Sequence, residues 1–303
     1  MAEEVTSLLH EERARVLARI QDERVQVVEL QFSDITGGAK ALSIPVSILP
    51  SVLDSGYRFD GSALTGLRQI ELTLALLPDP STLIVFPAQP DAPRRAQLSC
   101  TVRRLDGSYF PGDPRSVLLQ VVERARELGY DYRVSVEIEY YLVKNDSQKL
   151  GGPLANGLLA STGAGHYFDA GSHESALLRD EIIATLADLG ISCGGAHHET
   201  GPGQEEFDFG VLPAIELADQ LITSRQVIRA VAQQRGYRAS FMPKPFMDGP
   251  GSGMHLFQSF LDADGVDLLR SQRSDGLSRT GRSVIGGQLA HASGMALILC
   301  PTV

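Results

Sequence analysis

One segment, YRVSVEIEYYLV at 132–143, restricts the fold of this chain more than any other. Its residues alternate between the two sides with a period of two, which is typical of a β-strand with one buried face. One face carries the apolar residues Val134, Val136, Ile138, Tyr140 and Leu142. The other face carries Ser135, Glu137, Glu139 and Tyr141. We therefore expect a long strand that shows two carboxylates, about 7 Å apart at the backbone, either to solvent or to bound cations.

A second segment, AHHETGPGQEEFDF at 196–209, has the pattern of a strand, a glycine-rich turn and a second strand. Phe207 alternates with Glu206, so the ring is expected to face the core and the carboxylate to face away. Glu199 and Glu206 flank the turn and are expected close together, about 5 Å apart at their β-carbons if paired. Carboxylates with an occasional imidazole suit Mg²⁺ or Mn²⁺ better than zinc. The adjacent His197 and His198 remain open between cation ligands and hydrogen-bonded core residues.

A third segment, ASFMPKPFMDGPGSGMHLFQSF at 239–260, contains the glycine-rich stretch GPGSG. Glycine lets a backbone approach a small ligand closely, although a loop of this kind is by itself more often a simple turn. The strand that follows places His255, Phe257 and Ser259 on one face.

The rest of the chain predicts an α+β fold in two domains, 1–105 and 106–303. The first part suggests a helix at 3–20, a hairpin formed by 25–34 and 39–47, and strands at 81–87 and 97–105. Turn residues at 106–114 mark the boundary, and Asp113-Pro114 is the expected start of a helix that ends at Gly129. Further helices are expected at 173–189 and 213–235, and further strands at 191–199, 204–209, 237–242 and 254–260.

Composition excludes several classes of partner. The net charge of −10 argues against nucleic acid and anionic membranes, because nothing supplies the field that phosphate binding needs. No signal peptide and no apolar run of about 20 residues is evident, which argues against a membrane span. The three cysteines are widely spaced, which favours a reducing compartment. We therefore expect a cytoplasmic protein.

Taken together, the segments resemble the glutamine synthetase family. The resemblance is carried by EIEYYL (137–142), HHETGPGQEE (197–206), FMPKPF (241–246) and GSGMHLFQS (251–259), and also by FDGSALTGL (59–67), PDPSTLIVFP (78–87) and IGGQLAHASGMALILCPTV (285–303). These motifs occur in the family order from about residue 25 to the end of the chain.

The resemblance implies a small β-grasp-like N-terminal domain and a glutamine synthetase catalytic domain with a largely antiparallel sheet. It also implies an ATP-dependent ligase that joins the side-chain carboxyl of glutamate to ammonia through a γ-glutamyl phosphate, with Mg²⁺ or Mn²⁺ bound. Subunits of the family assemble into rings that share sites at their interfaces, so a homo-oligomer is expected. By this resemblance, Glu139, Glu199 and Glu206 would hold one metal, and Glu137 and His255 would contribute to another. Asp60 would be the base that deprotonates ammonium in the site of a neighbouring subunit. Gly251 and His255 would contact glutamate, and Ser259 would lie near the nucleotide.

The sequence also departs from the family pattern. It ends at PTV, where the family continues with a further C-terminal part, so the catalytic domain is expected to be incomplete and this chain alone to lack part of its site. Phe257, Ala63 and Pro250 stand where a histidine, a serine and an asparagine are common, and Gly194, Gly210 and Val211 replace larger residues beside the nucleotide. These changes indicate either a subfamily with another substrate, such as a γ-glutamyl-amine (polyamine-type) ligase, or eroded nucleotide binding. A non-catalytic, metal-binding or oligomer-forming homologue is the remaining alternative.

Overall fold

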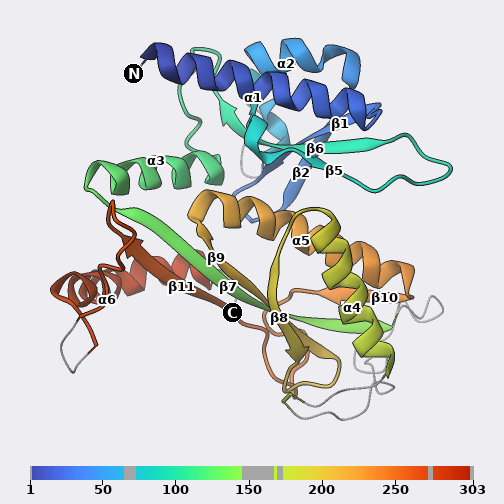
Figure 1. The fold of residues 1–303 in the computed structure, drawn as a ribbon. Coiled ribbons are helices and arrows are strands. Elements are labelled where there is room, and N and C mark those ends of the chain that lie inside the picture. The colour runs from blue at the N-terminus through green and yellow to red at the C-terminus, as the bar shows by residue number, and fades with distance from the viewer. Residues whose placement is uncertain (1, 65–72, 145–166, 169–172, 272–275, 301–303) are drawn as a thin grey trace.

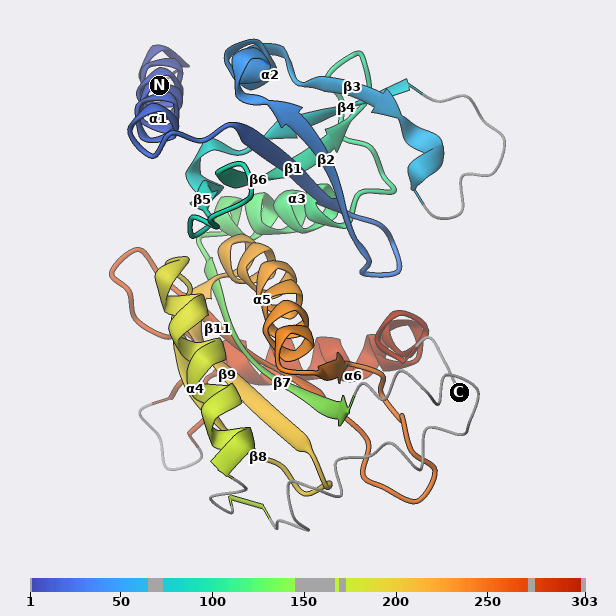
Figure 2. The ribbon, with the colours of Figure 1, turned by 90° about the vertical axis from the view of Figure 1, so that its right-hand side faces the viewer.

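A computed structural model describes residues 2–64, 73–144, 167–168, 173–271 and 276–300 of the chain. Two β-sheets lie one above the other, and helices α3 (Pro114–Glu127) and α5 (Ala214–Gln234) lie between them (Figures 1 and 2). The first sheet belongs to the N-terminal part of the chain and the second to the C-terminal part. The two sheets thus fall on either side of the predicted domain boundary at 105/106, which stays a prediction.

The first sheet has the strand order β2-β1-β6-β4-β3, with β5 also paired to β6. Its strands are β1 (Val27–Ser33), β2 (Ala39–Pro45), β3 (Tyr57–Asp60), β4 (Thr73–Pro78), β5 (Ile84–Val85) and β6 (Arg95–Arg103). The central β1 and β6 run parallel and the other pairs run antiparallel. Helices α1 (Ala2–Asp22) and α2 (Leu49–Ser55) accompany this sheet. The expected hairpin is therefore confirmed as β1 and β2, whereas most of the predicted strand 81–87 is wrong, because a short 3₁₀ turn at Pro80–Thr82 leaves only two residues in the ladder.

The second sheet is antiparallel throughout and is built around β7 (Asp131–Lys144). Its other strands are β8 (Cys193–His198), β9 (Gln204–Pro213), β10 (Tyr237–Ser240) and β11 (Met254–Leu261). Strand β9 pairs with one side of β7, while β11 and β10 pair with successive stretches of its other side. The long strand predicted from the alternating segment is thus the centre of the sheet.

The apolar face of β7 packs on a core that also includes α4 (His173–Asp188) and α5. Val134, Val136, Ile138, Tyr140 and Leu142 are all at most 6% exposed. Phe207 of β9 enters the same core, as expected, and so does Phe209. Because side chains alternate along a strand, Glu137, Glu139 and Glu206 must lie on the face turned away from these helices.

Helix α3 begins as predicted. The Asp113 side chain accepts hydrogen bonds from the N–H groups of Arg115 and Ser116, and Pro114 occupies the first turn. The Arg115 guanidinium is buried between two parts of the chain, donating to Asp219 of α5 at 2.8–3.2 Å and to Asp79, at the end of β4, at 2.8 Å. Charge-assisted hydrogen bonds from Arg115 to these two aspartates therefore join the N-terminal domain to α3 and α5.

The C-terminal end of the described chain is a helix, α6 (Arg279–Leu299), that the sequence reading did not identify as one. Its Leu289, Leu297 and Ile298 are 72–79% exposed. No helix among the described residues is both long and apolar enough to cross a membrane.

Candidate metal centre

Strand pairing brings the acidic residues of three segments into rows across the open face of the second sheet. Glu137 of β7 lies between His255 of β11 and Asp208 of β9. The neighbouring row places Glu139 of β7 opposite Glu206 of β9, and Glu206 opposite His197 of β8. Sequence reasoning expected this convergence for Glu137, Glu139, Glu206 and His255, and the structure brings them together.

Glu139, Glu199 and Glu206 form one cluster of carboxylates. One oxygen of each lies within 4.8 Å of an oxygen of the other two, which is a spacing that a single divalent ion can bridge. Glu199 and Glu206 are 9% and 6% exposed, so water screens their repulsion poorly. The cluster is therefore well suited to a hard cation.

Glu199 reaches this cluster from the turn and not from a paired position. The residue opposite Glu206 on β8 is His197, and Glu199 lies just beyond the end of β8, where its N–H donates to the carbonyl of Gln204. The prediction that Glu199 could pair directly with Glu206 across the hairpin is therefore wrong, whereas the prediction that the two residues lie close together is confirmed. The N–H and hydroxyl of Thr200 both donate to the Glu199 carboxylate, at 2.6 and 2.9 Å, and fix its direction.

The turn itself depends on glycine. Gly203 has φ +71°, a conformation that other residues rarely adopt, and a β-carbon on Gly201 would lie 2.2 Å from the Tyr141 hydroxyl. The close approach of this turn to β7 sets the position of Glu199 beside Glu139.

Glu137 and His255 form a second pair. The Nδ1 atom of His255 lies 3.1 Å from a Glu137 oxygen, on the outer part of the sheet where His255 is exposed. This pair is separate from the three-carboxylate cluster but lies on the same face of β7. The residues expected to hold a second metal are therefore adjacent.

Two contributors were missed by the sequence reading. The side-chain amide of Gln204 donates to Glu139 at 2.8 Å and to the carbonyl of Gly251 at 2.9 Å, so it ties the glycine-rich loop to the cluster. Asp208 groups with His197 and Glu206 in a second set of potential ligands within 4.8 Å. Its position two residues after Glu206, on the same strand face, was a signal that could have identified it.

The two histidines have different surroundings. His197 stacks on Phe168 at 4.1 Å and has its Nε2 3.7 Å from Glu206. His198 is 1% exposed, and its two ring nitrogens have no hydrogen-bond partner among the described residues. The sequence left the roles of the two histidines open. The structure favours His197, and not His198, as the histidine in contact with the carboxylates.

The electrostatics of the face are dominated by uncompensated negative charge. Within the described ranges, no lysine or arginine pairs with Glu137, Glu139, Glu199, Glu206 or Asp208. Burial, a hydrogen bond with Glu199 and the charges of Asp208, Glu199 and Glu137 raise the pKa of Glu206 to about 8. One oxygen of Asp208 is also buried without a hydrogen-bond partner among these residues. Each of these features suits a site for divalent cations.

The glycine-rich loop approaches the acidic face of the sheet closely. A β-carbon on Gly253 would lie 3.0 Å from Oε1 of Glu139 and 3.1 Å from Nε2 of His255. At Gly251, a β-carbon would lie 2.9 Å from the carbonyl oxygen of Pro243. Only glycine leaves this space free.

The remaining expected residues lie apart from the cluster. Asp60 is exposed at the end of β3 in the N-terminal domain, where its carboxylate caps a short turn by accepting from the Ser62 N–H at 2.9 Å. Ser259 lies further along β11, opposite Arg133. Part of the motif around Asp60, residues 65–67, is outside the described residues.

Comparison with known families decides the relationship. Residues 111–303 match the profile of the glutamine synthetase catalytic domain, and residues 24–104 match that of the glutamine synthetase beta-Grasp domain. The chain belongs to the glutamine synthetase family. The predicted family and the α+β fold class with a β-grasp N-terminal domain are thereby confirmed.

Curated glutamine synthetases are similar over nearly the whole chain. The enzyme of Halobacterium salinarum is 36% identical over 98% of this chain, and that of Mycobacterium bovis is 36% identical over 91%. The aligned regions cover only 65% and 62% of those proteins. The chain thus spans slightly less than two thirds of the length of these glutamine synthetases.

Solved structures of the family have the same fold. The ADP complex of GmaS superposes with a TM-score of 0.82 at 28% identity, covering 95% of this chain and 65% of that one. Glutamine synthetase of Plasmodium falciparum gives a TM-score of 0.81 at 20% identity, which supports the fold alone.

Proposed function

We propose that this chain provides the metal-holding part of an ATP-dependent ligase that joins the side-chain carboxyl of glutamate to an amine, in the first instance ammonia. The observation that carries the proposal is the convergence of Glu137, Glu139, Glu199, Glu206 and His255 on one face of the sheet. Membership of the glutamine synthetase family supports it independently. The reaction would pass through a γ-glutamyl phosphate.

The residues fit divalent cations. Glu139, Glu199 and Glu206 would hold one Mg²⁺ or Mn²⁺, and Glu137 and His255 would contribute to another, because clustered carboxylates without a basic partner favour a hard cation. Such cations neutralise the phosphates of ATP and polarise the transferred phosphoryl group. Gln204 would be a positioning residue, because its side-chain amide donates hydrogen bonds to both Glu139 and the backbone carbonyl of Gly251.

The other residues have roles that the family resemblance suggests. The Gly251 backbone would approach glutamate together with His255, and Ser259 would lie near the nucleotide. Asp60 would remove a proton from ammonium. Because Asp60 lies in the N-terminal domain and outside the carboxylate clusters, this role fits a homo-oligomer in which Asp60 serves the site of a neighbouring subunit. The three free cysteines fit a reducing compartment such as the cytoplasm.

The acceptor amine is a separate question. Similarity to GmaS, a γ-glutamylmethylamide synthetase, favours an amine larger than ammonia as the second candidate. Phe257, half exposed on β11, is an apolar residue near the proposed site and is compatible with such an acceptor.

The test is ADP release by the purified chain with Mg²⁺, ATP and glutamate, comparing ammonium, methylamine and putrescine as acceptors. Ligase activity of this chain predicts release that depends on glutamate and on one amine, whereas a chain that lacks part of its site, as the sequence suggests, would release none. Glu206→Gln should reduce the release on the order of 100-fold, because the charge that holds the cation is removed. The exposed Glu11→Gln on α1 is the matched control and should leave it unchanged.

The outcomes separate the alternatives. Preference for methylamine or putrescine over ammonium would assign the chain to the γ-glutamyl-amine ligases. Absence of ADP release with every amine, in a chain that still binds Mn²⁺, would reject ligase activity for this polypeptide and leave the non-catalytic homologue.

A further inference from the structure

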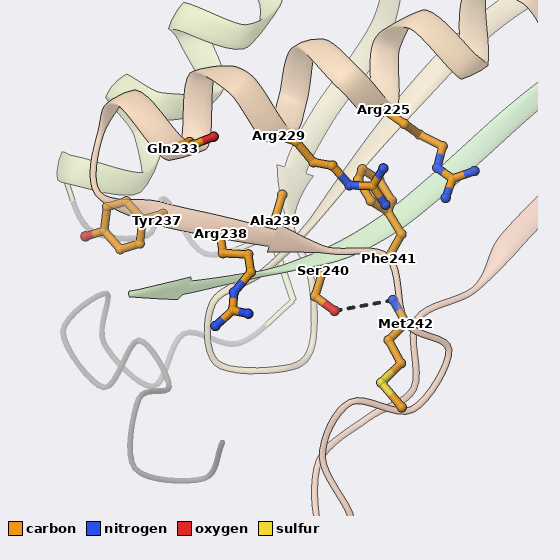
Figure 3. Close-up of a pocket in the computed structure, with 9 residues that line it drawn as sticks. All are labelled: Arg225, Arg229, Gln233, Tyr237, Arg238, Ala239, Ser240, Phe241 and Met242. Carbon is orange, nitrogen blue, oxygen red and sulfur yellow. Dashed lines mark hydrogen bonds between the residues drawn. The ribbon is translucent and has the colours of Figure 1, made fainter. Parts of the chain in front are cut away.

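A cavity of about 670 Å³ lies between α5 and β10, outside the carboxylate clusters. Arg225 and Arg229 line it from α5, and Arg238 lines it from β10 (Figure 3). Its volume falls within the range of small-molecule sites, about 300–1,000 Å³. Three guanidinium groups around one cavity favour a negatively charged ligand.

The positive charge of this cavity is not compensated by any residue that the structure describes. Among these residues, no aspartate or glutamate lines the cavity, and none of the three arginines forms an ion pair. The Nε atom of Arg225 is buried without a hydrogen-bond partner in the described part of the chain, and its NH1 has only a long contact, 3.4 Å, to the carbonyl of Gly37. Burial, together with the charge of Arg229, lowers the pKa of Arg225. The group is thus partly desolvated and lacks an anion.

Phe241 holds two of the arginines in place. The guanidinium carbons of Arg225 and Arg229 lie 5.2 and 5.1 Å from the centre of its ring, and Figure 3 shows both side chains beside it. Stacking on an aromatic ring fixes the plane of a guanidinium while leaving its N–H groups free to donate. The two like charges are therefore preorganised next to each other.

The cavity is distinct from the candidate metal centre. The Phe241 ring packs on Tyr140 at 5.3 Å, and Tyr140 belongs to the face of β7 that packs on α5. Glu139, the adjacent residue, points to the opposite face. A ligand in the cavity would thus be separated from the carboxylates by the sheet.

We propose that this cavity binds a small polyanion, a molecule with two or more carboxylate or phosphate groups. Arginine pairs with the oxygens of both groups through two parallel hydrogen bonds, and several guanidinium groups at one site favour more than one negative charge. The hydroxyl of Ser240 accepts a 3.4 Å hydrogen bond from the Met242 N–H, so its own hydrogen remains available to the ligand.

The experiment is calorimetric titration of the chain with citrate and, separately, with pyrophosphate, at constant ionic strength and in the presence of EDTA so that no metal bridges the anion to the carboxylates. We expect saturable one-to-one binding of at least one probe. The double variant Arg229→Gln/Arg238→Gln changes two exposed side chains and should weaken binding at least about tenfold, since each charge-assisted contact contributes strongly. Arg126→Gln, an exposed arginine on α3, is the control and should change the affinity less than about twofold.

The two probes distinguish the sources of the charge. Binding of citrate alone identifies a carboxylate ligand, binding of pyrophosphate alone identifies a phosphate ligand, and either result supports the proposal. No saturable binding of either probe, or equal affinity in the wild type and the double variant, overturns it. Thermal unfolding of each variant establishes that it is folded, and the single variant Arg238→Gln, on an edge strand, provides the same comparison if the double variant is not.

Discussion

Glu139 and Glu206 lie directly opposite each other on the neighbouring antiparallel strands β7 and β9. Like charges at directly opposed positions destabilise a sheet, and here Glu199 adds a third carboxylate within 4.8 Å. At a pH above the pKa of Glu206, where all three groups are ionised, this arrangement opposes folding in the metal-free state. A bound divalent cation would attract all three carboxylates and so offset their mutual repulsion. Metal binding at this site should therefore stabilise the folded chain.

Replacing Glu206 should therefore have opposite effects with and without metal. Without metal and at about pH 8.5, above the pKa of Glu206, Glu206→Gln should stabilise the chain by about 0.2–1 kcal/mol, because it removes a repulsive cross-strand pair. With Mn²⁺ at about 100 times its Kd, the wild type should gain about 2.7 kcal/mol, and the variant should lose most of this gain. Urea unfolding with and without Mn²⁺ measures both quantities.

The control for this comparison is Glu11→Gln, which removes one exposed carboxylate from α1. It should change neither the metal-free stability nor the gain from Mn²⁺. An equal gain in Glu206→Gln and in the wild type would contradict the assignment of Glu206 as a ligand.

The stabilisation by metal should depend on pH. Burial, the hydrogen bond with Glu199 and the neighbouring acidic charges raise the pKa of Glu206 in the folded chain from 4.5 to about 8. Between these two values the folded state binds more protons than the unfolded state, so metal-free stability falls as pH rises through this window. A cation must displace that proton, so Mg²⁺ should raise the Tm little at about pH 6 and more at about pH 8.5.

Differential scanning calorimetry at several pH values, with and without Mg²⁺, measures this increment. In Glu206→Gln the increment should be small at every pH. A wild-type increment that is constant or that decreases toward high pH would show that Glu206 does not release its proton to the cation.

Gly253 provides a test of geometry without a change of charge. In Gly253→Ala the new methyl group would lie 3.0 Å from Oε1 of Glu139 and 3.1 Å from Nε2 of His255. Both atoms end flexible side chains, so they can move at a cost below about 1 kcal/mol in stability, but the movement displaces potential ligands. Affinity for Mn²⁺ should fall about tenfold, measured by calorimetric titration.

Gly210→Ala is the matched control, because a β-carbon at Gly210 of β9 would meet no atom within 4 Å. It should leave the affinity for Mn²⁺ unchanged. Equal affinities in the two variants would place the cation away from Glu139 and His255.

Much of the metal centre could be predicted because it depends on local periodicity. Alternation in 132–143 defined β7 and the face of Glu137 and Glu139, and the GPG turn indicated that β8 and β9 form a hairpin. The register was not predictable, because Glu199 reaches the cluster from a turn whose path depends on Gly201 packing against Tyr141. The role of Gln204 also depends on a loop that is distant in sequence.

The elements that were missed lack a local signal of this kind. Strand β4, TLALLP, is a continuous apolar run without alternation, which does not separate a strand from a helix. Helix α6 contains Gly281, Gly286, Gly287 and Gly294, residues that lower helix propensity. The Arg115 pair with Asp79 and Asp219 joins residues up to 140 positions apart along the chain, so composition gave no indication of it.

Breaking this buried ion pair should destabilise the chain strongly. The Arg115 side chain is 8% exposed and donates to both Asp79 and Asp219. Arg115→Leu would leave two acidic groups without their partner, so we expect a loss of about 3–5 kcal/mol in the free energy of unfolding, measured in urea.

Two further variants serve as comparisons for the stability of Arg115→Leu. Arg115→Leu/Asp219→Leu should recover part of the loss, because it removes one of the unpaired charges. Arg124→Ala disrupts the exposed pair of Arg124 with Glu127 and should cost less than about 1 kcal/mol. A loss in Arg115→Leu no larger than that in Arg124→Ala would show that the Arg115 pair does not stabilise the contact between the domains.

The proposed role of Asp60 in a neighbouring subunit's site can be tested by mixing inactive chains. Asp60 lies in the N-terminal domain, where hydrogen bonds from the Ser62 backbone and side chain hold the pKa of its carboxyl below the usual value, so it is ionised at neutral pH. Asp60→Asn and Glu206→Gln should each lose ADP release, while Asp60→Asn should keep its affinity for Mn²⁺. If each site combines Asp60 of one subunit with Glu206 of another, oligomers reassembled from an equal mixture should contain intact sites at roughly a quarter of positions. Recovery of about that fraction of wild-type ADP release supports the shared site, and a mixture as inactive as its two components contradicts it.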